Sequence, residues 1–171
     1  MDRRRFLKGM GVAAAVGLAA QAAVAREEGE HAMDKHDYRA APCGLYCGIC
    51  GDYLNDVCHG CGCDCGKCIG KAHSDNCDID KCVEGKKLES CADCKELPCT
   101  RLIQFTVHPI WLTHAPCIEN LRRRKKIGTE AWLKEQEAYW QDDKRRRQRR
   151  FLGAECERRM DEYREANEKQ D

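Results

Sequence analysis

The chain has 171 residues, which allows one ordinary domain or a small domain with appendages. Its 30 basic and 29 acidic side chains leave a formal net charge of +1, and 15 of its residues are cysteine. A nearly balanced charge does not supply the basic surface that nucleic acid requires, so we expect no nucleic-acid partner.

The first 25 residues are predicted to be a targeting segment. The run Asp2-Arg3-Arg4-Arg5-Phe6-Leu7-Lys8 resembles the twin-arginine translocation signal S/T-R-R-x-F-L-K, with aspartate in place of the leading hydroxyl residue. A short, weakly apolar stretch follows at 9–22, and residues 23–25 have the small side chains of a cleavage site. We therefore expect residues 1–25 to be a twin-arginine signal peptide, and the mature protein to begin at Arg26 and to be periplasmic or exported.

Export by this route changes how the cysteines are interpreted. Cysteines outside the cytoplasm ordinarily form disulfides. The twin-arginine machinery moves proteins that have already folded, so a metal ion can bind in the reducing cytoplasm before export. Residues 26–41 are predicted to be a linker, since they begin with a polar, charged run that has no apolar periodicity.

The cysteines concentrate in one stretch. Between Cys43 and Cys99 lie 13 of the 15, with too few large apolar residues to fold so short a segment by burial alone. Metal ions or disulfides must therefore cross-link it. Two thiolates spaced C-x-x-C can bind one ion. The stretch has four such pairs: Cys47/Cys50, Cys58/Cys61, Cys65/Cys68 and Cys91/Cys94.

Two of these pairs are followed by glycine, at 47–51 and 58–62. The pattern C-x-x-C-G is typical of the metal-binding turns of zinc ribbons and rubredoxin-like sites, because glycine lets backbone N–H groups turn toward a sulfur. It predicts a metal site in this region, and four sulfurs suffice for one tetrahedral ion. The spacing leaves open which cysteines share an ion.

The insert between Cys61 and Cys65 contains two overlapping C-x-C steps. In an extended chain Cys61, Cys63 and Cys65 point to one side. This arrangement suits copper(I) or a multinuclear thiolate cluster. The alternative is that some of these cysteines are spare ligands or form a disulfide within a loop.

The cysteine pattern as a whole resembles a family of cysteine-rich prokaryotic proteins, domain-of-unknown-function family 3795. The matching segments are C-G-L-Y-C-G-x-C from Cys43, C-x-G-C from Cys58, the pair Cys77 and Cys82, C-x-x-C from Cys91, L-P-C at Cys99, and the segments around Ile118 and Trp132. The resemblance covers roughly residues 42–140. It implies a zinc-binding protein with no assigned reaction.

The cysteines that match this pattern are the candidate metal ligands: Cys43, Cys47, Cys50, Cys58, Cys61, Cys77, Cys82, Cys91, Cys94 and Cys99. The chain departs from the family in two ways. Cys63, Cys65 and Cys68 are additional to the usual set. Some members also have a further zinc-ribbon motif after the region of Trp140, where this chain has a charged segment with only Cys156.

The most apolar stretch lies between Cys99 and Cys117. Residues 102–107 predict a short helix, and prolines at 109 and 116 break the apolar segment that follows. His108 and His114, together with Cys117, offer the donor atoms of a mixed nitrogen and sulfur site, but packing roles fit their spacing better.

The part that follows is predicted to be helical. A helix over 118–126 should end at Gly128, with Thr129 as the N-cap of the next helix. That next helix carries an apolar stripe, which we expect to pack on the cysteine module. The stripe consists of Trp132, Leu133, Gln136, Tyr139 and Trp140.

A dense basic run occupies residues 144–150. It predicts a solvated helix face, with Asp142 and Asp143 pairing with arginines four residues on. The alternative is a surface that docks on anionic membrane headgroups or on an acidic partner. We expect Gly153 to interrupt this helix and a second charged helix to cover 154–169.

Together these features predict a small metal-stabilised, irregular and α-helical cysteine-rich module with short helices at 42–117, followed by a charged C-terminal α-helical region at 118–171. The chain has no nucleophile, metalloprotease or phosphate-loop motif, so we expect a binding protein rather than an enzyme. Zinc held by cysteine thiolates is the expected cofactor. The alternatives are iron or an iron–sulfur cluster with a redox partner, and copper(I) on thiolates.

Overall fold

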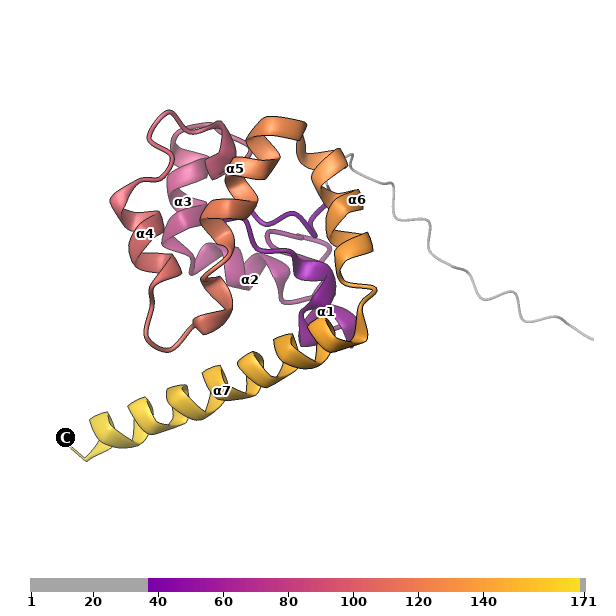
Figure 1. Cartoon of the computed structure of the whole chain (residues 1–171). Coiled ribbons are helices and arrows are strands. Elements are labelled where there is room, and N and C mark those ends of the chain that lie inside the picture. The colour runs from indigo at the N-terminus through magenta and orange to yellow at the C-terminus, as the bar shows by residue number, and fades with distance from the viewer. Residues whose placement is uncertain (1–36, 170–171) are drawn as a thin grey trace, which may run out of the picture. The chain divides into compact units, whose positions relative to one another are not determined.

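The computed structural model describes residues 37–169, so the predicted signal peptide and most of the predicted linker lie outside the described residues. Helices (α) and short 3-10 turns (η) follow one another along this range (Figure 1). In order they are η1 (Cys47–Ile49), α1 (Gly51–Leu54), α2 (Gly70–Asp75), α3 (Asp78–Gly85), η2 (Cys91–Asp93), α4 (Thr100–Thr106), η3 (Leu112–His114), α5 (Cys117–Ile127), α6 (Thr129–Tyr139) and α7 (Asp143–Glu168). The predicted fold class is confirmed: residues 37–169 hold short helices, an isolated bridge between Ala40 and Tyr46, and one long C-terminal helix.

The core of the cysteine-rich part is built from small side chains. Its largest cluster of buried residues joins α3, η2, α4 and α5 to the segment around Cys43. The members are Ala41, Cys43, Ile79, Val83, Cys91, Ala92, Leu102 and Leu121. Most of these are alanine, cysteine or valine, so the apolar area buried is modest and burial alone stabilises this part weakly.

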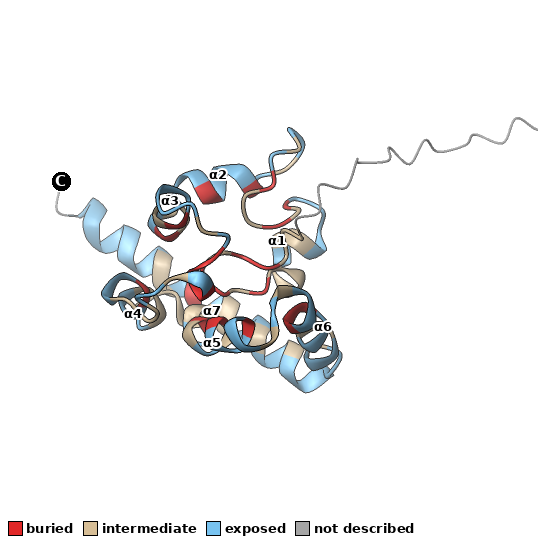
Figure 2. Ribbon diagram, turned by 90° about the horizontal axis from the view of Figure 1, so that it is seen from above, coloured by how far each residue is buried: buried red, intermediate tan, exposed pale blue. Residues whose placement is uncertain are grey.

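Local sequence explains how α3 joins that core. Asp78 and Asp80 occupy its first turn, where negative charge is favourable at the partly positive end of a helix. Ile79 and Val83 are four residues apart and share one face, and both are buried. Figure 2 shows that the buried residues face the space that the helices surround, while the exposed residues lie on the outer sides of the helices.

The helices α5 and α6 meet at Gly128, which has a φ of +84°. The helix predicted to end at this glycine is confirmed, but the N-cap of α6 is Gly128 and not Thr129, which is already the first helical residue. A positive φ suits glycine, and this turn lets α6 pack back on α5.

A second cluster of buried residues holds α6 in place. Trp132 is fully buried and packs edge-to-face on Tyr46, with ring centroids 6.1 Å apart. The guanidinium of Arg124 lies 5.2 Å from the centroid of the Trp132 ring and donates a 2.7 Å hydrogen bond to the carbonyl of Ala41. The predicted packing of this stripe on the cysteine module is therefore confirmed at Trp132 and Leu133, while Tyr139 is exposed.

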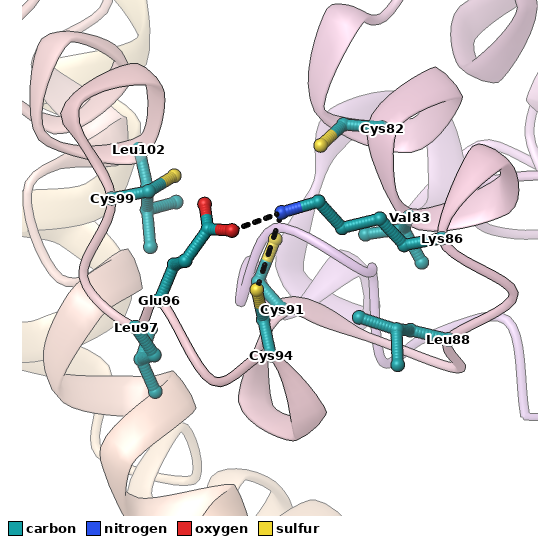
Figure 3. Close-up of a pocket in the computed structure, with 10 residues that line it drawn as sticks. All are labelled: Cys82, Val83, Lys86, Leu88, Cys91, Cys94, Glu96, Leu97, Cys99 and Leu102. Carbon is teal, nitrogen blue, oxygen red and sulfur yellow. Dashed lines mark hydrogen bonds and ion pairs between the residues drawn. The ribbon is translucent and has the colours of Figure 1, made fainter.

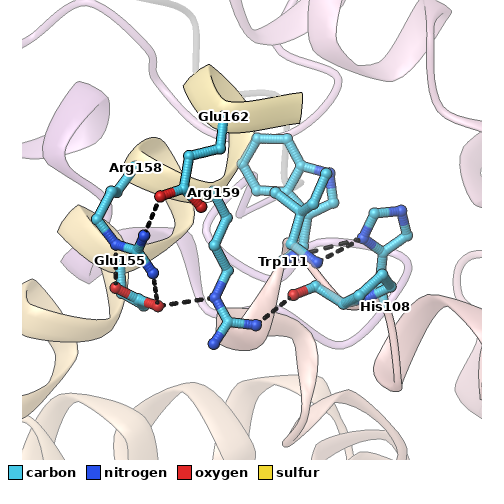
Figure 4. A network of polar contacts seen from close by, with 8 residues as sticks. His108, Trp111, Glu155, Arg158, Arg159 and Glu162 are labelled. Atoms are coloured by element: carbon cyan, nitrogen blue, oxygen red, sulfur yellow. Dashed lines mark hydrogen bonds and ion pairs between the residues drawn. The ribbon is translucent and has the colours of Figure 1, made fainter. Parts of the chain in front are cut away.

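The helix α7 runs from Asp143 to Glu168 without interruption, so the predicted break at Gly153 is wrong. A glycine inside a helix costs only about 1 kcal/mol. Here ion pairs one turn apart offset that cost: Glu155 accepts from Arg158 and from Arg159, and Arg158 also pairs with Glu162 (Figure 4). Arg159 also donates a 2.6 Å hydrogen bond to the carbonyl of Pro109, which fixes α7 to the segment before η3.

Candidate metal centre

Four donor side chains come together in the irregular segment before α2. They are His59, Cys63, Cys65 and Cys68, and their ligand atoms all lie within 4.8 Å of one another. We call this group the His59 centre. Cys63 is buried, and the other three side chains are half-buried. Among residues 37–169 this is the group whose donors are close enough to share a metal ion as they stand.

Backbone contacts shape the segment around the centre. Its two ends are joined by a 3.1 Å hydrogen bond from the N–H of Ile69 to the carbonyl of Val57. Gly60 has a φ of +111°, and a Cβ there would lie 2.2 Å from the carbonyl oxygen of Tyr38, so a residue with a side chain would force this contact apart. The adjacent N–H of Cys61 donates to that same oxygen at 3.1 Å. Glycine therefore allows the close approach that anchors the segment.

The two nitrogens of His59 have different partners. Nδ1 lies 3.3 Å from the sulfur of Cys65, while Nε2 lies 3.0 Å from a carboxylate oxygen of Asp56. A histidine that binds metal through one nitrogen typically donates its other N–H to a carboxylate, which fixes the ring orientation. With Nε2–H donating to Asp56, Nδ1 is the ring atom available to a metal ion.

The thiols of the centre differ in acidity. Burial, together with hydrogen bonds that its thiol donates to Cys65 and Cys68, raises the pKa of Cys63 to about 12. Burial also acts to raise the pKa of Cys68, but the backbone N–H groups of His59 and Gly70 and the nearby thiols outweigh it and lower that pKa to about 7. The N–H of Gly70 lies 3.4 Å from the Cys68 sulfur. The centre therefore already stabilises one thiolate, the form that binds metal.

One neutral imidazole and three thiolates form a donor set that proteins use for tetrahedral ions. Four protein donors fill the tetrahedral shell, whereas a catalytic zinc keeps one position open for water or substrate. The arrangement can therefore hold an ion and stabilise the fold around it.

The ten cysteines predicted as ligands lie elsewhere, mainly in two neighbourhoods. The first contains Cys43, Cys47, Cys61 and Cys77, whose thiols are close enough to affect one another's pKa. Burial raises the pKa of Cys47 to about 12 and that of Cys61 further still. The Cys43 thiol also contacts that of Cys117 in α5, and this hydrogen bond and burial raise the pKa of Cys43 well above its usual value.

The second neighbourhood contains Cys82, Cys91, Cys94 and Cys99, which line one small cavity. The remaining two candidates, Cys50 and Cys58, lie at the edge of the first neighbourhood. The sulfur of Cys58 accepts a 3.4 Å hydrogen bond from the N–H of Gly60, as the predicted C-x-x-C-G turn implies. The assignment of these ten as ligands stays a prediction.

His59 was not among the predicted ligands, and Cys63, Cys65 and Cys68 lay outside the expected set, although these four residues form the candidate centre. The available signal was their spacing, H-x3-C-x-C-x2-C. The predicted edge of Cys61, Cys63 and Cys65 forms only in part, since Cys63 and Cys65 belong to the His59 centre while Cys61 lies near Cys47.

The histidines near Trp111 have packing roles, as expected. The Nδ1 of His108 accepts hydrogen bonds from the N–H groups of Ile110 and Trp111, at 3.2 and 3.4 Å. The ring of His114 stacks on Phe105 with centroids 3.9 Å apart, and burial lowers its pKa to about 4.

The basic run at the start of α7 is partly engaged within the chain. Asp142 accepts a 2.8 Å hydrogen bond from the backbone N–H of Arg145 as N-cap, and Asp143 pairs with Arg146 at 2.5 Å, three residues on rather than the four predicted. Arg145 lies over the Tyr139 ring, 4.0 Å from its centroid. Docking of this helix on an anionic surface stays a prediction.

No protein-family model, curated protein or solved structure matches the chain. Within residues 37–169 no helix combines the length and apolar character needed to cross a membrane.

We predict that Asp56→Asn weakens metal binding at the His59 centre about tenfold, because carboxylate partners of metal-binding histidines typically contribute this much or more. Asparagine suits the substitution because it tolerates the positive φ of +59° that Asp56 adopts. Competition with a chromophoric chelator measures the affinity. The matched control is Asp64→Asn, an exposed aspartate in the same segment. Equal affinities for the two variants would contradict the orienting role of Asp56.

Proposed function

We propose that this chain is a zinc-binding protein whose His59 centre holds a structural ion. The observation that supports this proposal is the approach of one imidazole nitrogen and three sulfurs to within 4.8 Å of one another. Zinc favours four-coordinate sites of three cysteines and one histidine, and such sites contribute folding free energy directly. The small side chains of the core agree with this role, since metal binding can supply stability that burial does not. The resemblance to family 3795 points the same way and stays a prediction.

Copper(I) is the second candidate. Both cysteines of the step Cys63–Cys65 belong to the centre, and closely spaced thiolates suit a soft monovalent ion. Histidine as the fourth donor favours zinc over copper(I) here. An iron–sulfur cluster is the third candidate, and its sites are mostly built from cysteine alone.

Elemental analysis of the protein as isolated tests this proposal. We expect at least one zinc per chain, little iron or copper, and a colourless protein. Iron on thiolates would give a brown or red protein and would support electron transfer with a redox partner. Stoichiometric copper would support the second candidate. Protein without metal and with oxidised thiols would overturn metal binding altogether.

We further propose that the protein is exported by the twin-arginine route. Replacing both arginines of the signal, Arg3→Lys with Arg4→Lys, should retain the protein in the cytoplasm, since the pattern requires the pair. Cell fractionation measures this. Arg5→Lys is the matched control, because it changes the variable position of the pattern. Export of the double variant at the rate of the control would refute this route.

A further inference from the structure

A second group of cysteines surrounds a small cavity far along the chain from the His59 centre. Its volume is about 20 Å³, and it lies between α3, η2 and the start of α4. Cys82 comes from α3, Cys91 from η2, Cys94 from the residue after η2, and Cys99 from the N-cap of α4. Figure 3 shows their sulfurs directed into the same space.

Apolar side chains enclose this group. Val83, Leu88, Leu97 and Leu102 also line the cavity. The four sulfurs therefore lie around one small space in largely apolar surroundings.

The ammonium group of Lys86 lies beside these four cysteines. The ammonium of Lys86 lies 3.8 Å from the sulfur of Cys94 and 3.0 Å from a carboxylate oxygen of Glu96 (Figure 3). Lys86 and Glu96 both line the cavity. The Lys86 ammonium is therefore placed to donate a hydrogen bond to a thiolate at Cys94.

We propose that Cys82, Cys91, Cys94 and Cys99 form a second metal site, a tetrathiolate site for zinc that is separate from the His59 centre. We call it the Cys82 site. Four thiolates around a divalent ion carry a net charge of −2, and the ammonium of Lys86 offsets part of it by donating to Cys94. The Cys82 site shares no residue with the His59 centre.

The geometry of the Cys82 site is more open than that of the His59 centre. Its sulfurs are not gathered within 4.8 Å of one another, as those of the His59 centre are. The cavity between them has room for about one water-sized sphere, comparable with a single ion. A tetrahedral ion placed there requires the cysteine side chains to rotate about Cα–Cβ between their staggered positions until all four sulfurs reach it. Zinc binding therefore takes up space that the core leaves unfilled.

Cobalt(II) titration of the full chain, followed by visible spectroscopy, distinguishes the two sites. A tetrathiolate site and a site with three sulfurs and one nitrogen give different ligand-field bands, because nitrogen moves these bands to higher energy. We expect Cys82→Ser with Cys99→Ser to lower bound cobalt by one ion per chain and to remove the tetrathiolate spectrum alone. The matched variant, Cys65→Ser with Cys68→Ser, should remove the other spectrum alone.

Unchanged cobalt content in the Cys82→Ser, Cys99→Ser protein would overturn the Cys82 site and leave the proposed function intact. So would disulfides among these four cysteines in protein isolated under reducing conditions, detected by alkylation and mass spectrometry. The Cys65→Ser, Cys68→Ser protein should lose the spectrum of the site with three sulfurs and one nitrogen and keep the tetrathiolate spectrum. That result would support the two sites separately.

A variant that keeps all four ligands tests the site even where the cysteine variants fail to fold. Lys86→Met should weaken cobalt binding at the Cys82 site about tenfold and leave the His59 centre unchanged, since hydrogen bonds to metal ligands typically contribute this much. Lys95→Met, at an exposed lysine nearby, is the control. Equal affinities for the two lysine variants would contradict the assigned arrangement.

Discussion

Replacing Cys65 and Cys68 together by serine is expected to remove one zinc ion per chain and to loosen the segment between Val57 and Gly70. A ligand that binds only the folded state stabilises it by about 4 kcal/mol when its free concentration is a thousand times Kd. We therefore expect the free energy of unfolding in zinc-containing buffer to fall by about that much. Trypsin should also cleave faster after Lys67, which is exposed within this segment.

Cys156→Ser is the control for this variant. Cys156 is a buried cysteine in α7 and does not belong to the His59 centre. The control should keep its full zinc content and its resistance to trypsin at Lys67. If the double variant bound as much zinc as the control, the His59 centre would not be a metal site.

Truncating Trp132 to alanine should destabilise the protein by about 3–5 kcal/mol, the range found for large aromatic residues removed from a core. Trp132 is fully buried between Tyr46 and Arg124, so its loss opens a cavity and exposes the Arg124 guanidinium to an empty space. For a folded region of this size the midpoint of thermal unfolding should fall by roughly 10–20 °C. Circular dichroism of the zinc-loaded protein measures the shift.

Two further variants make the Trp132 prediction specific. Phe151→Ala removes an aromatic ring that is 71% exposed on α7, so it should cost no more than about 0.5 kcal/mol. Trp132→Phe keeps a ring but removes the indole N–H, which is buried without a hydrogen-bond partner among residues 37–169. Trp132→Phe should therefore lose much less folding stability than Trp132→Ala does. A loss below 1 kcal/mol for Trp132→Ala would show that α6 is not held by this contact.

The sequence allowed the region of the candidate metal centre to be predicted but not the group of donors that comes together there. Cysteine spacing indicates that thiolates can share an ion, yet it does not determine which thiolates meet. The donors of the His59 centre meet because Gly60, Gly62 and Gly66 take positive φ values of +111°, +85° and +69° and turn the chain back on itself. At Gly60 the turn also depends on a close approach to Tyr38, a residue distant in sequence that a local pattern does not contain.

The helices were predicted best where their signals are local. The helix predicted over 102–107 is α4, and the one predicted over 118–126 is α5, which ends at the glycine that marks it. The predicted break at Gly153 failed for the opposite reason. Ion pairs further along α7 and its contact with Pro109 keep the helix continuous, and neither follows from the glycine itself.

The position of the His59 centre within the chain bears on how the protein folds. Its four donors all lie between residues 59 and 68, so an ion closes only a short loop, at a small entropic cost. Contacts between residues close in sequence form early and quickly. We therefore expect the metal-bound loop to form before the helices dock, and to act as a nucleus on which the rest of the module assembles.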